Sequence, residues 1–224
     1  MKKFLSVVLM LTLSVAMYAQ KDVTKFLGIP VDGTKSAMIQ KLKAKGFTYN
    51  SVTDMLEGEF NGSEVRISVV TNRNKVYRIY VADKYACDEG DIKIRFNNLC
   101  RQFENNDKYL GDNDQTLSDD EDISYEITVN NKRYEAIFFQ KTDEEQKEKY
   151  VRDRLLEKYT AEQLADTSQV MQGKVSCDEL IFRLDYIKNT KSKPVWFMIN
   201  QEYGRYRVLM YYDNEYNKSD GEDL

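Results

Sequence analysis

The chain has 224 residues, of which 42% are hydrophobic and 12% aromatic, so it can build a folded core and does not belong to the disordered or fibrous classes. Its formal net charge of -4 disfavours a dedicated nucleic-acid-binding protein, because phosphate contacts need a concentrated basic surface. Histidine is absent, which excludes Ser-His-Asp and Cys-His catalytic pairs and histidine-ligated metal sites.

The N-terminus has the layout of a secretory signal peptide. A basic pair precedes the apolar run Phe4–Met17, and cleavage fits after Ala16 or after Ala19. The run is shorter than the ~20 residues that span a bilayer, so we expect removal rather than membrane anchoring. Residues 1–19 are therefore predicted to be a signal peptide. Residues 20–224 are predicted to be one exported α+β domain, periplasmic or extracellular, with no membrane insertion.

The segment Phe26–Ser36 nearly spells a phosphate-binding loop. However, a threonine separates its lysine from the second glycine, and a proline lies inside the loop. We therefore expect no nucleotide and no other cofactor. Thr34 or Ser36 fits the N-cap of a helix, and Gly46 fits the end of that helix.

Three parts of the chain resemble a group of uncharacterised secreted proteins of Bacteroides-like bacteria. They are the leader, the stretch FLGIPVDGTKSAMIQKLKAKGF at residues 26–47 and the ending MYYDNEYNKSDGEDL at residues 210–224. The middle of the chain shares little with the group. Because the group has no established activity, the resemblance implies an envelope location and no particular chemistry.

The region after the first helix predicts a meander of strands and then a second helix. Residues 55–60 and 63–71 flank Asn61-Gly62, a strong signal for a two-residue hairpin turn, and residues 76–82 continue the meander. Apolar residues recur with helical spacing over residues 88–105, and acidic residues stand at its start. We expect this helix to pack its apolar stripe on the sheet.

Residues 111–122, GDNDQTLSDDED, raise the question of a calcium site. An EF-hand loop that began at Asp112 would need glycine where Leu117 stands and glutamate where Ile123 stands. We interpret the segment as a solvated acidic loop and expect no metal site.

Three further segments lead to the C-terminal hairpin. Residues 123–129 and 133–139 alternate like a second hairpin, and Thr142 with Glu145 has the spacing of a capping box that opens a third helix. Residues 176–188 fit a strand and a helix equally well, and we assign a strand.

The strongest predicted hairpin runs from Pro194 to Asp213, two aromatic-rich strands joined by a glycine-containing loop. The predicted order is α-βββ-α-ββ-α-βββ, an α+β fold with about three helices and mainly antiparallel pairing. Residues 77–83 resemble the run that begins at Tyr206, which suggests two related halves, about 24–107 and 108–224.

Three cysteines leave the pattern of disulfides open. Cys87 with Cys100 is disfavoured, because the predicted helix would hold the two residues too far apart. A bridge between Cys100 and Cys177 and a set of three separate buried thiols both remain open.

The candidate binding residues are aromatic side chains of the C-terminal hairpin: Trp196, Tyr203, Tyr206 and Tyr212. Tyrosine and tryptophan join apolar area to a polar handle and can stack on sugar rings or peptide side chains. The same residues would equally serve to fill the interior of a sheet.

We expect an exported, noncatalytic binding or interaction protein of the bacterial cell envelope. Its partner is an unknown protein or glycan, and not a nucleic acid. The alternative is a carboxylate-based hydrolase of envelope or dietary polymers that uses acids between Asp213 and Asp223. Nothing in their spacing promises a pair of acids held in a cleft, so we assign no catalytic residue and expect no enzyme.

Overall fold

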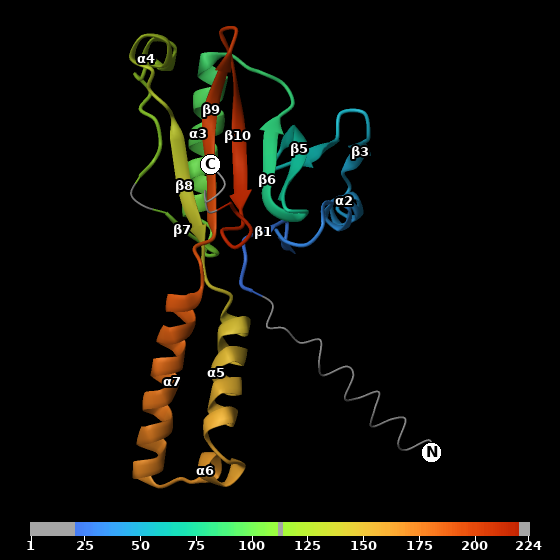
Figure 1. Ribbon diagram of the computed structural model, residues 1–224. Coiled ribbons are helices and arrows are strands. Elements are labelled where there is room, and N and C mark those ends of the chain that lie inside the picture. Colours follow the sequence, from blue (N-terminus) through green and yellow to red (C-terminus); the bar gives the residue numbers. More distant parts are fainter. Residues whose placement is uncertain (1–20, 112–113, 220–224) are drawn as a thin grey trace, which may run out of the picture. The chain divides into compact units, whose positions relative to one another are not determined.

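The computed structural model describes residues 21–111 and 114–219, which form two compact units (Figure 1). The sheet unit comprises Val23–Thr142 and the residues from Lys191 onward, and the helical unit comprises Asp143–Thr190. The predicted signal peptide at 1–19 lies outside the described residues. In the part of the chain that is described, no helix combines the length and the apolar character needed to span a membrane.

Eight strands form one sheet in the order β3-β4-β5-β6-β10-β9-β8-β7, and every neighbouring pair is antiparallel. The predicted α+β class with antiparallel pairing is confirmed. A two-stranded ribbon of β1 (Lys25–Phe26) and β2 (Ile29–Pro30) precedes the sheet. The strands of the sheet are β3 (Thr48–Asn50), β4 (Met55–Phe60), β5 (Ser63–Asn72), β6 (Lys75–Asp83), β7 (Tyr109–Gly111), β8 (Glu135–Gln140), β9 (Pro194–Glu202) and β10 (Arg205–Asp213).

Each half of the sheet consists of four strands that follow one another in the chain, and in the second half further helices lie between them. The helix α2 (Lys35–Ala44) precedes β3 to β6, and α3 (Glu89–Glu104) precedes β7 to β10. The last strands of the two sets, β6 and β10, pair with each other at the centre of the sheet. In this order α3 precedes the strands of the second set, whereas the sequence predicts that residues 88–105 belong to the first half.

Local signals explain how these elements begin and turn. Thr34 is the N-cap of α2, and its hydroxyl accepts a hydrogen bond from the Ala37 amide at 3.3 Å. Asp88 caps α3 in the same way. Asn61 and Gly62 have φ angles of 51° and 73°, the left-handed conformation that a two-residue turn between twisted strands requires.

The core lies between one face of the sheet and the helices α2 and α3. Figure 1 shows α3 crossing one side of β9 and β10, and its Phe96 ring meets Phe197 edge-on at 5.1 Å. Each such burial contributes roughly 1.5–3 kcal/mol. The centre of the core is a row of residues in register across the sheet, each at most 2% exposed: Leu56, Ile67, Val81, Met210, Phe197 and Ala136.

Residues 123–129 form a helix, and the predicted strand there is wrong. The helix α4 (Ile123–Asn130) begins at the N-cap Asp122, whose side chain accepts a hydrogen bond from an amide of the first turn. Ile123 and Ile127 are spaced for one face of a helix as well as for one face of a strand, so alternation could not decide between the two. The strand β8 pairs with β7 and β9 instead of with this segment.

The helical unit contains α5 (Glu144–Lys158), α6 (Ala161–Ala165) and α7 (Gln169–Asn189). The predicted strand at 176–188 is wrong, because this segment lies within α7. The helix α5 begins one residue later than predicted, with Asp143 rather than Thr142 as its N-cap. The described residues therefore form six helices where the sequence predicts about three, and the predicted order of elements does not hold.

Aromatic and charged side chains hold α5 and α7 together. The Tyr150 hydroxyl of α5 donates a hydrogen bond to Asp185 at 2.5 Å, and its ring lies 5.3 Å from the ring of Tyr186. Arg183 forms an ion pair with Glu148. These contacts with α5 stabilise residues 176–188 as a helix, because their apolar pattern alone fits a helix and a strand equally well.

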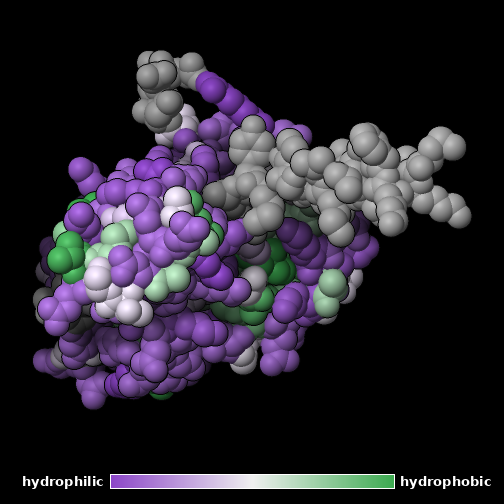
Figure 2. All heavy atoms as spheres, turned by 90° about the horizontal axis from the view of Figure 1, so that it is seen from below, coloured by the Kyte–Doolittle hydropathy of each residue, from purple (hydrophilic) through white to green (hydrophobic). Residues whose placement is uncertain are grey.

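Hydrophilic side chains make up most of the surface seen in Figure 2, and hydrophobic side chains reach it in separate patches. All three cysteines are free thiols: Cys100 is buried, Cys87 half-buried and Cys177 exposed. Of the two arrangements that the sequence leaves open, the structure shows separate thiols, with Cys177 at the surface rather than buried.

Candidate binding face of the sheet

The side of the sheet opposite α2 and α3 carries aromatic residues at its centre. Tyr80, Tyr211, Trp196 and Ile137 stand opposite one another on β6, β10, β9 and β8. The three aromatic residues are half-buried, and Ile137 is 41% exposed. Among the described residues of the sheet unit no helix covers this side, which we call the open face (Figure 1).

The rings of the open face pack on one another. Trp196 and Tyr211 stack with ring centroids 3.9 Å apart and an interplanar angle of 15°. Tyr80 lies on the other side, with its ring 5.3 Å from Tyr211 and tilted by 48°. The stack therefore covers one face of the Trp196 ring and one face of the Tyr211 ring.

An ion pair lies beside this row, two residues away along β6 and β10. The Arg78 guanidinium donates to Asp213 through Nε at 2.6 Å and through Nη2 at 2.7 Å, the bidentate geometry that makes a charge-assisted pair strong. The Asp213 side chain is only 5% exposed and that of Arg78 is 24% exposed. The pair is therefore largely buried. Solvent and salt screen the attraction between its two charges only weakly.

Arg78 also faces the rings. Its Cζ lies 4.9 Å from the centroid of Tyr211 and 5.6 Å from that of Trp196, within reach of a cation–π attraction. Hydrogen bonding to Asp213 raises the pKa of Arg78 above its ordinary value. Burial raises the pKa of Tyr80 and of Tyr211, so both phenols are uncharged at neutral pH and can donate and accept hydrogen bonds.

Both carboxylate oxygens of Asp213 accept hydrogen bonds from side chains of the sheet. Asp213 Oδ1 accepts from Arg78, and Oδ2 accepts from Arg78 and from Trp196 Nε1 at 3.3 Å. A carboxylate acting as general base or nucleophile must reach a substrate atom, and these oxygens are already engaged.

The structure separates the four binding residues predicted from the sequence. Trp196 lies on the open face, but Tyr206 and Tyr212 point into the core and are 2% and 3% exposed. Tyr203 is 98% exposed at the turn between β9 and β10. The predicted set therefore does not form one surface.

The four residues chosen from the sequence do not include Tyr80, Tyr211 or Arg78. The signal that could have found them is the alternation along the strands, because Trp196 faces away from Phe197 and its neighbours on β10 and β6 share that orientation. Tyr211 and Tyr212 are adjacent in the chain and therefore lie on opposite faces. Choosing between them requires the register of β9 with β10.

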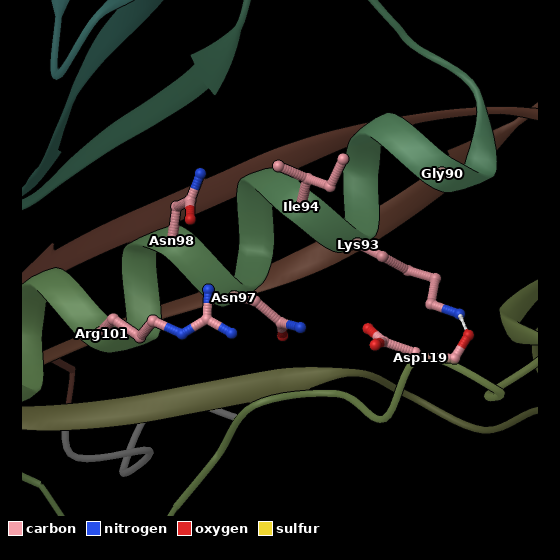
Figure 3. Close-up of a pocket in the computed structure, with 7 residues that line it drawn as sticks. All are labelled: Gly90, Lys93, Ile94, Asn97, Asn98, Arg101 and Asp119. Carbon is pink, nitrogen blue, oxygen red and sulfur yellow. Dashed lines mark hydrogen bonds between the residues drawn. The ribbon is translucent and has the colours of Figure 1, made fainter.

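A shallow depression of about 290 Å³ lies between α3 and the acidic loop. In Figure 3, Lys93 and Arg101 extend from α3 on the side of the loop, whereas Ile94 and Asn98 lie on the other side. Lys93 Nζ donates to the backbone oxygens of Asp119 and Glu121 at 2.6 and 2.8 Å. The polar groups of this depression thus hold the loop against the helix.

Asn97 completes this attachment. It is 7% exposed, donates to the Leu117 carbonyl at 2.9 Å and accepts from the Leu117 amide at 2.7 Å. Among the described residues no group of three or more metal-ligating side chains comes together. Asp112, where the rejected EF-hand template would begin, lies outside the described residues.

A second polar cluster joins Glu89, Ser124 and Tyr206. Ser124 Oγ lies 2.5 Å from the Tyr206 hydroxyl and donates to the Glu89 carboxylate, which also accepts from the Ile123 amide at 3.0 Å. Glu89 thereby satisfies the first amide of α4, as a capping carboxylate does. We interpret the cluster as the attachment of α4 to the start of α3, because no imidazole is present to activate the serine.

Comparison of the chain with family models, with curated proteins and with solved structures found no match to any of them.

Proposed function

We propose that this chain is an exported, noncatalytic binding protein of the bacterial cell envelope, and that its open face binds a partner protein. The observation that carries the proposal is the aromatic row of Tyr80, Tyr211, Trp196 and Ile137, which lies across four neighbouring strands on the side away from the helices. Aromatic residues on an exposed, relatively flat surface are characteristic of protein interfaces.

Ring orientation favours a protein over a glycan. A sugar stacks on the free face of an aromatic ring, and here Trp196 and Tyr211 cover each other at 3.9 Å. The surface of another protein mixes apolar and polar groups. Such a surface fits the ring edges, the Tyr80 hydroxyl and the aliphatic Ile137 better than a sugar does.

The apolar character of the open face continues toward β7. Phe139 is 36% exposed and Leu110 is 56% exposed, and the two stand opposite each other on β8 and β7. On the β5 side the face becomes polar, with Arg66 paired to Glu57 at 3.1 Å. An apolar centre with a charged border is the usual composition of a protein interface.

The envelope location rests on the leader-like N-terminus and on the resemblance described from the sequence. Secretion can be checked directly by fractionating the source cells and determining the N-terminal residue of the processed protein. Processing near Ala16 or Ala19 is the expected result, and a full-length chain in the cytoplasmic fraction would contradict export.

Binding is tested with immobilised protein and a detergent-solubilised extract of the source cell envelope. The wild-type chain should retain a defined protein that free wild-type chain displaces in a saturable manner. Trp196→Ala and Tyr211→Ala should each reduce retention at least tenfold, because central aromatic residues carry most of the energy of an interface. The matched control is Tyr203→Ala, which removes a tyrosine that is 98% exposed at the turn and should retain the partner like wild type.

Circular dichroism and urea unfolding of each variant show whether the fold survives the substitution. Equal retention by wild type and by both folded open-face variants would contradict the proposal. A glycan array that shows saturable binding abolished by Trp196→Ala would replace the protein partner with a sugar. Turnover of a glycoside or peptide that is lost in Asp213→Asn would favour a hydrolase instead.

A further inference from the structure

The helix α7 has two different faces. The side toward α5 carries the polar and aromatic contacts, such as Asp185 with Tyr150 and Arg183 with Glu148. The other side is apolar and exposed: Val170 is 72% exposed, Leu180 64%, Ile181 52%, Leu184 67% and Ile187 51%. Together with the exposed Cys177, these six residues form what we call the α7 stripe.

The stripe has the spacing of a coiled-coil seam. Val170, Cys177 and Leu184 recur at seven-residue intervals, as do Gly173, Leu180 and Ile187, and the two series alternate by three and four residues. In heptad terms the first series occupies the a positions and the second the d positions. A seam of this kind buries its apolar side chains only when another helix lies along it.

From this pattern we propose that the α7 stripe pairs with the α7 stripe of a second copy of the chain, antiparallel and related by a two-fold axis. The pair would be an antiparallel coiled coil between two helical units. A two-fold axis brings the same surface of each copy together, so a self-complementary seam is sufficient to form it.

Side-chain sizes favour the antiparallel direction. With the axis between Cys177 and Leu180, each a position faces a d position of the second copy. Cys177 then faces Leu180 and Gly173 faces Leu184, so a small residue meets a large one in both layers, as dense packing requires. A parallel pair would place glycine against glycine and leave a void.

The charged flanks differ between the two directions. A parallel coiled coil brings each g position beside the e position five residues further along the second copy, which would set Arg183 beside Lys188. The antiparallel pair separates Arg183 from Lys188, although it places the e positions Lys174 and Lys188 of the two copies on one flank. It also brings Ile181 of each copy to the same flank, which extends the apolar seam.

Gly173 agrees with this packing. A Cβ atom built on it would meet no atom of the chain within 4 Å, so nothing in the described structure requires glycine there. Glycine costs a helix interior about 1 kcal/mol relative to alanine. In the proposed dimer Leu184 of the second copy lies close to Gly173, and this contact would explain why a glycine stands there.

The area of the stripe is sufficient for a dimer. A side chain of this size removes roughly 100 Å² of apolar surface from water when it is buried. Five of them give about 500 Å² for each copy and about 1,000 Å² for the pair, which reaches the lower limit of specific interfaces. We therefore expect a reversible dimer rather than a permanent one.

The first test is the mass of the purified protein in solution, by light scattering and sedimentation equilibrium at tens of micromolar. The wild type should have twice the mass of one chain. Leu184→Glu places a charge in the seam and should halve that mass without changing the circular dichroism. Lys149→Glu, an exposed change on α5 away from the stripe, is the matched control and should remain dimeric.

The second test distinguishes the direction, in a background with Cys177→Ser. Val170→Cys and Ile187→Cys chains are mixed and oxidised with copper phenanthroline. The antiparallel pair places residue 170 against residue 187 of the second copy, so mixed disulfide dimers should form and Val170→Cys alone should not cross-link. Cross-linking of Val170→Cys with itself would show a parallel pair and overturn the antiparallel assignment.

A monomeric wild type at these concentrations would overturn the proposal altogether. If Cys177 of that monomer also resisted thiol reagents, the stripe would be covered within the chain itself. If Cys177 reacted freely, the stripe would face solvent or a different partner. If the Leu184→Glu variant remains dimeric, the interface lies elsewhere on the chain. This result would equally contradict pairing through the α7 stripe.

Discussion

Arg78 and Asp213, 135 residues apart in the chain, join β6 to β10 through two hydrogen bonds of 2.6 and 2.7 Å. The pair lies at the seam where the last strands of the two helix-and-four-strand sets meet. It therefore joins the two halves of the sheet. Asp213 also accepts a hydrogen bond from Trp196, which links the pair to the aromatic residues of the open face.

Breaking this pair should destabilise the protein. Arg78→Met leaves Asp213 charged at a position where its side chain is only 5% exposed, and we expect the free energy of unfolding to fall by about 3 kcal/mol. Urea unfolding measures the change. Adding Asp213→Leu should recover more than half of the loss, because the unpaired charge is removed.

An exposed pair provides the control for that measurement. Arg66 and Glu57 are also bonded across two strands, but their side chains are 44% and 41% exposed. Arg66→Met should cost less than about 1 kcal/mol. Equal losses for Arg78→Met and Arg66→Met would show that the seam pair contributes no more than an ordinary surface pair.

Trp196 is the sole tryptophan of the chain, so its fluorescence reports on the open face. The Tyr211 ring stacks on it at 3.9 Å, and Tyr211→Ala should expose the indole to water. The emission maximum should then shift to longer wavelength and acrylamide quenching should increase. Tyr203→Ala should change neither property, and an unchanged spectrum in Tyr211→Ala would contradict the stacked geometry.

Cys100 should be inert in the folded protein. Its side chain is fully buried, and burial raises the pKa of the thiol to about 12. The thiolate is the reactive form of cysteine, and at pH 8 only about one Cys100 in ten thousand should be ionised. Labelling followed by mass spectrometry should find Cys100 modified only after unfolding in urea. Rapid labelling of native protein at this position would show that the core opens near α3.

Acid should loosen the contact between α5 and α7. Hydrogen bonding from Lys158 lowers the pKa of Asp178, and hydrogen bonding from Arg183 lowers the pKa of Glu148. A folded pKa below the unfolded value contributes stability above about pH 4, and this contribution is lost as pH falls through the folded pKa. Amide hydrogen exchange in α5 and α7, corrected for the intrinsic effect of pH, should therefore accelerate between pH 6 and pH 3.

Asp178→Asn tests the origin of this acid sensitivity. The substitution removes one of the two titrating groups, so the difference in exchange between pH 6 and pH 3 should become smaller. If Asp178→Asn leaves the difference in exchange between pH 6 and pH 3 unchanged, other carboxylates cause the acid sensitivity. Asp153→Asn, an exposed change on α5, is the matched control and should behave like wild type.

Local signals in the sequence predicted several elements that the structure confirms. Thr34 and Asp88 cap α2 and α3, and Asn61-Gly62 turns the chain between β4 and β5. Each of these signals acts within a few residues, because a cap or a tight turn is satisfied by its immediate neighbours. The composition also determined that imidazole chemistry is absent.

Only tertiary structure decided between helix and strand at 123–129 and 176–188. Both segments carry apolar residues whose spacing fits either period, so contacts with other elements made the choice. Glu89 of α3 accepts from the first amide of α4, and Glu148 and Tyr150 of α5 bond to Arg183 and Asp185 of α7. Tertiary structure likewise decided that Tyr211 belongs to the open face and Tyr212 to the core. A strand with apolar residues on both sides does not reveal which side the helices will cover, since that depends on where α2 and α3 pack.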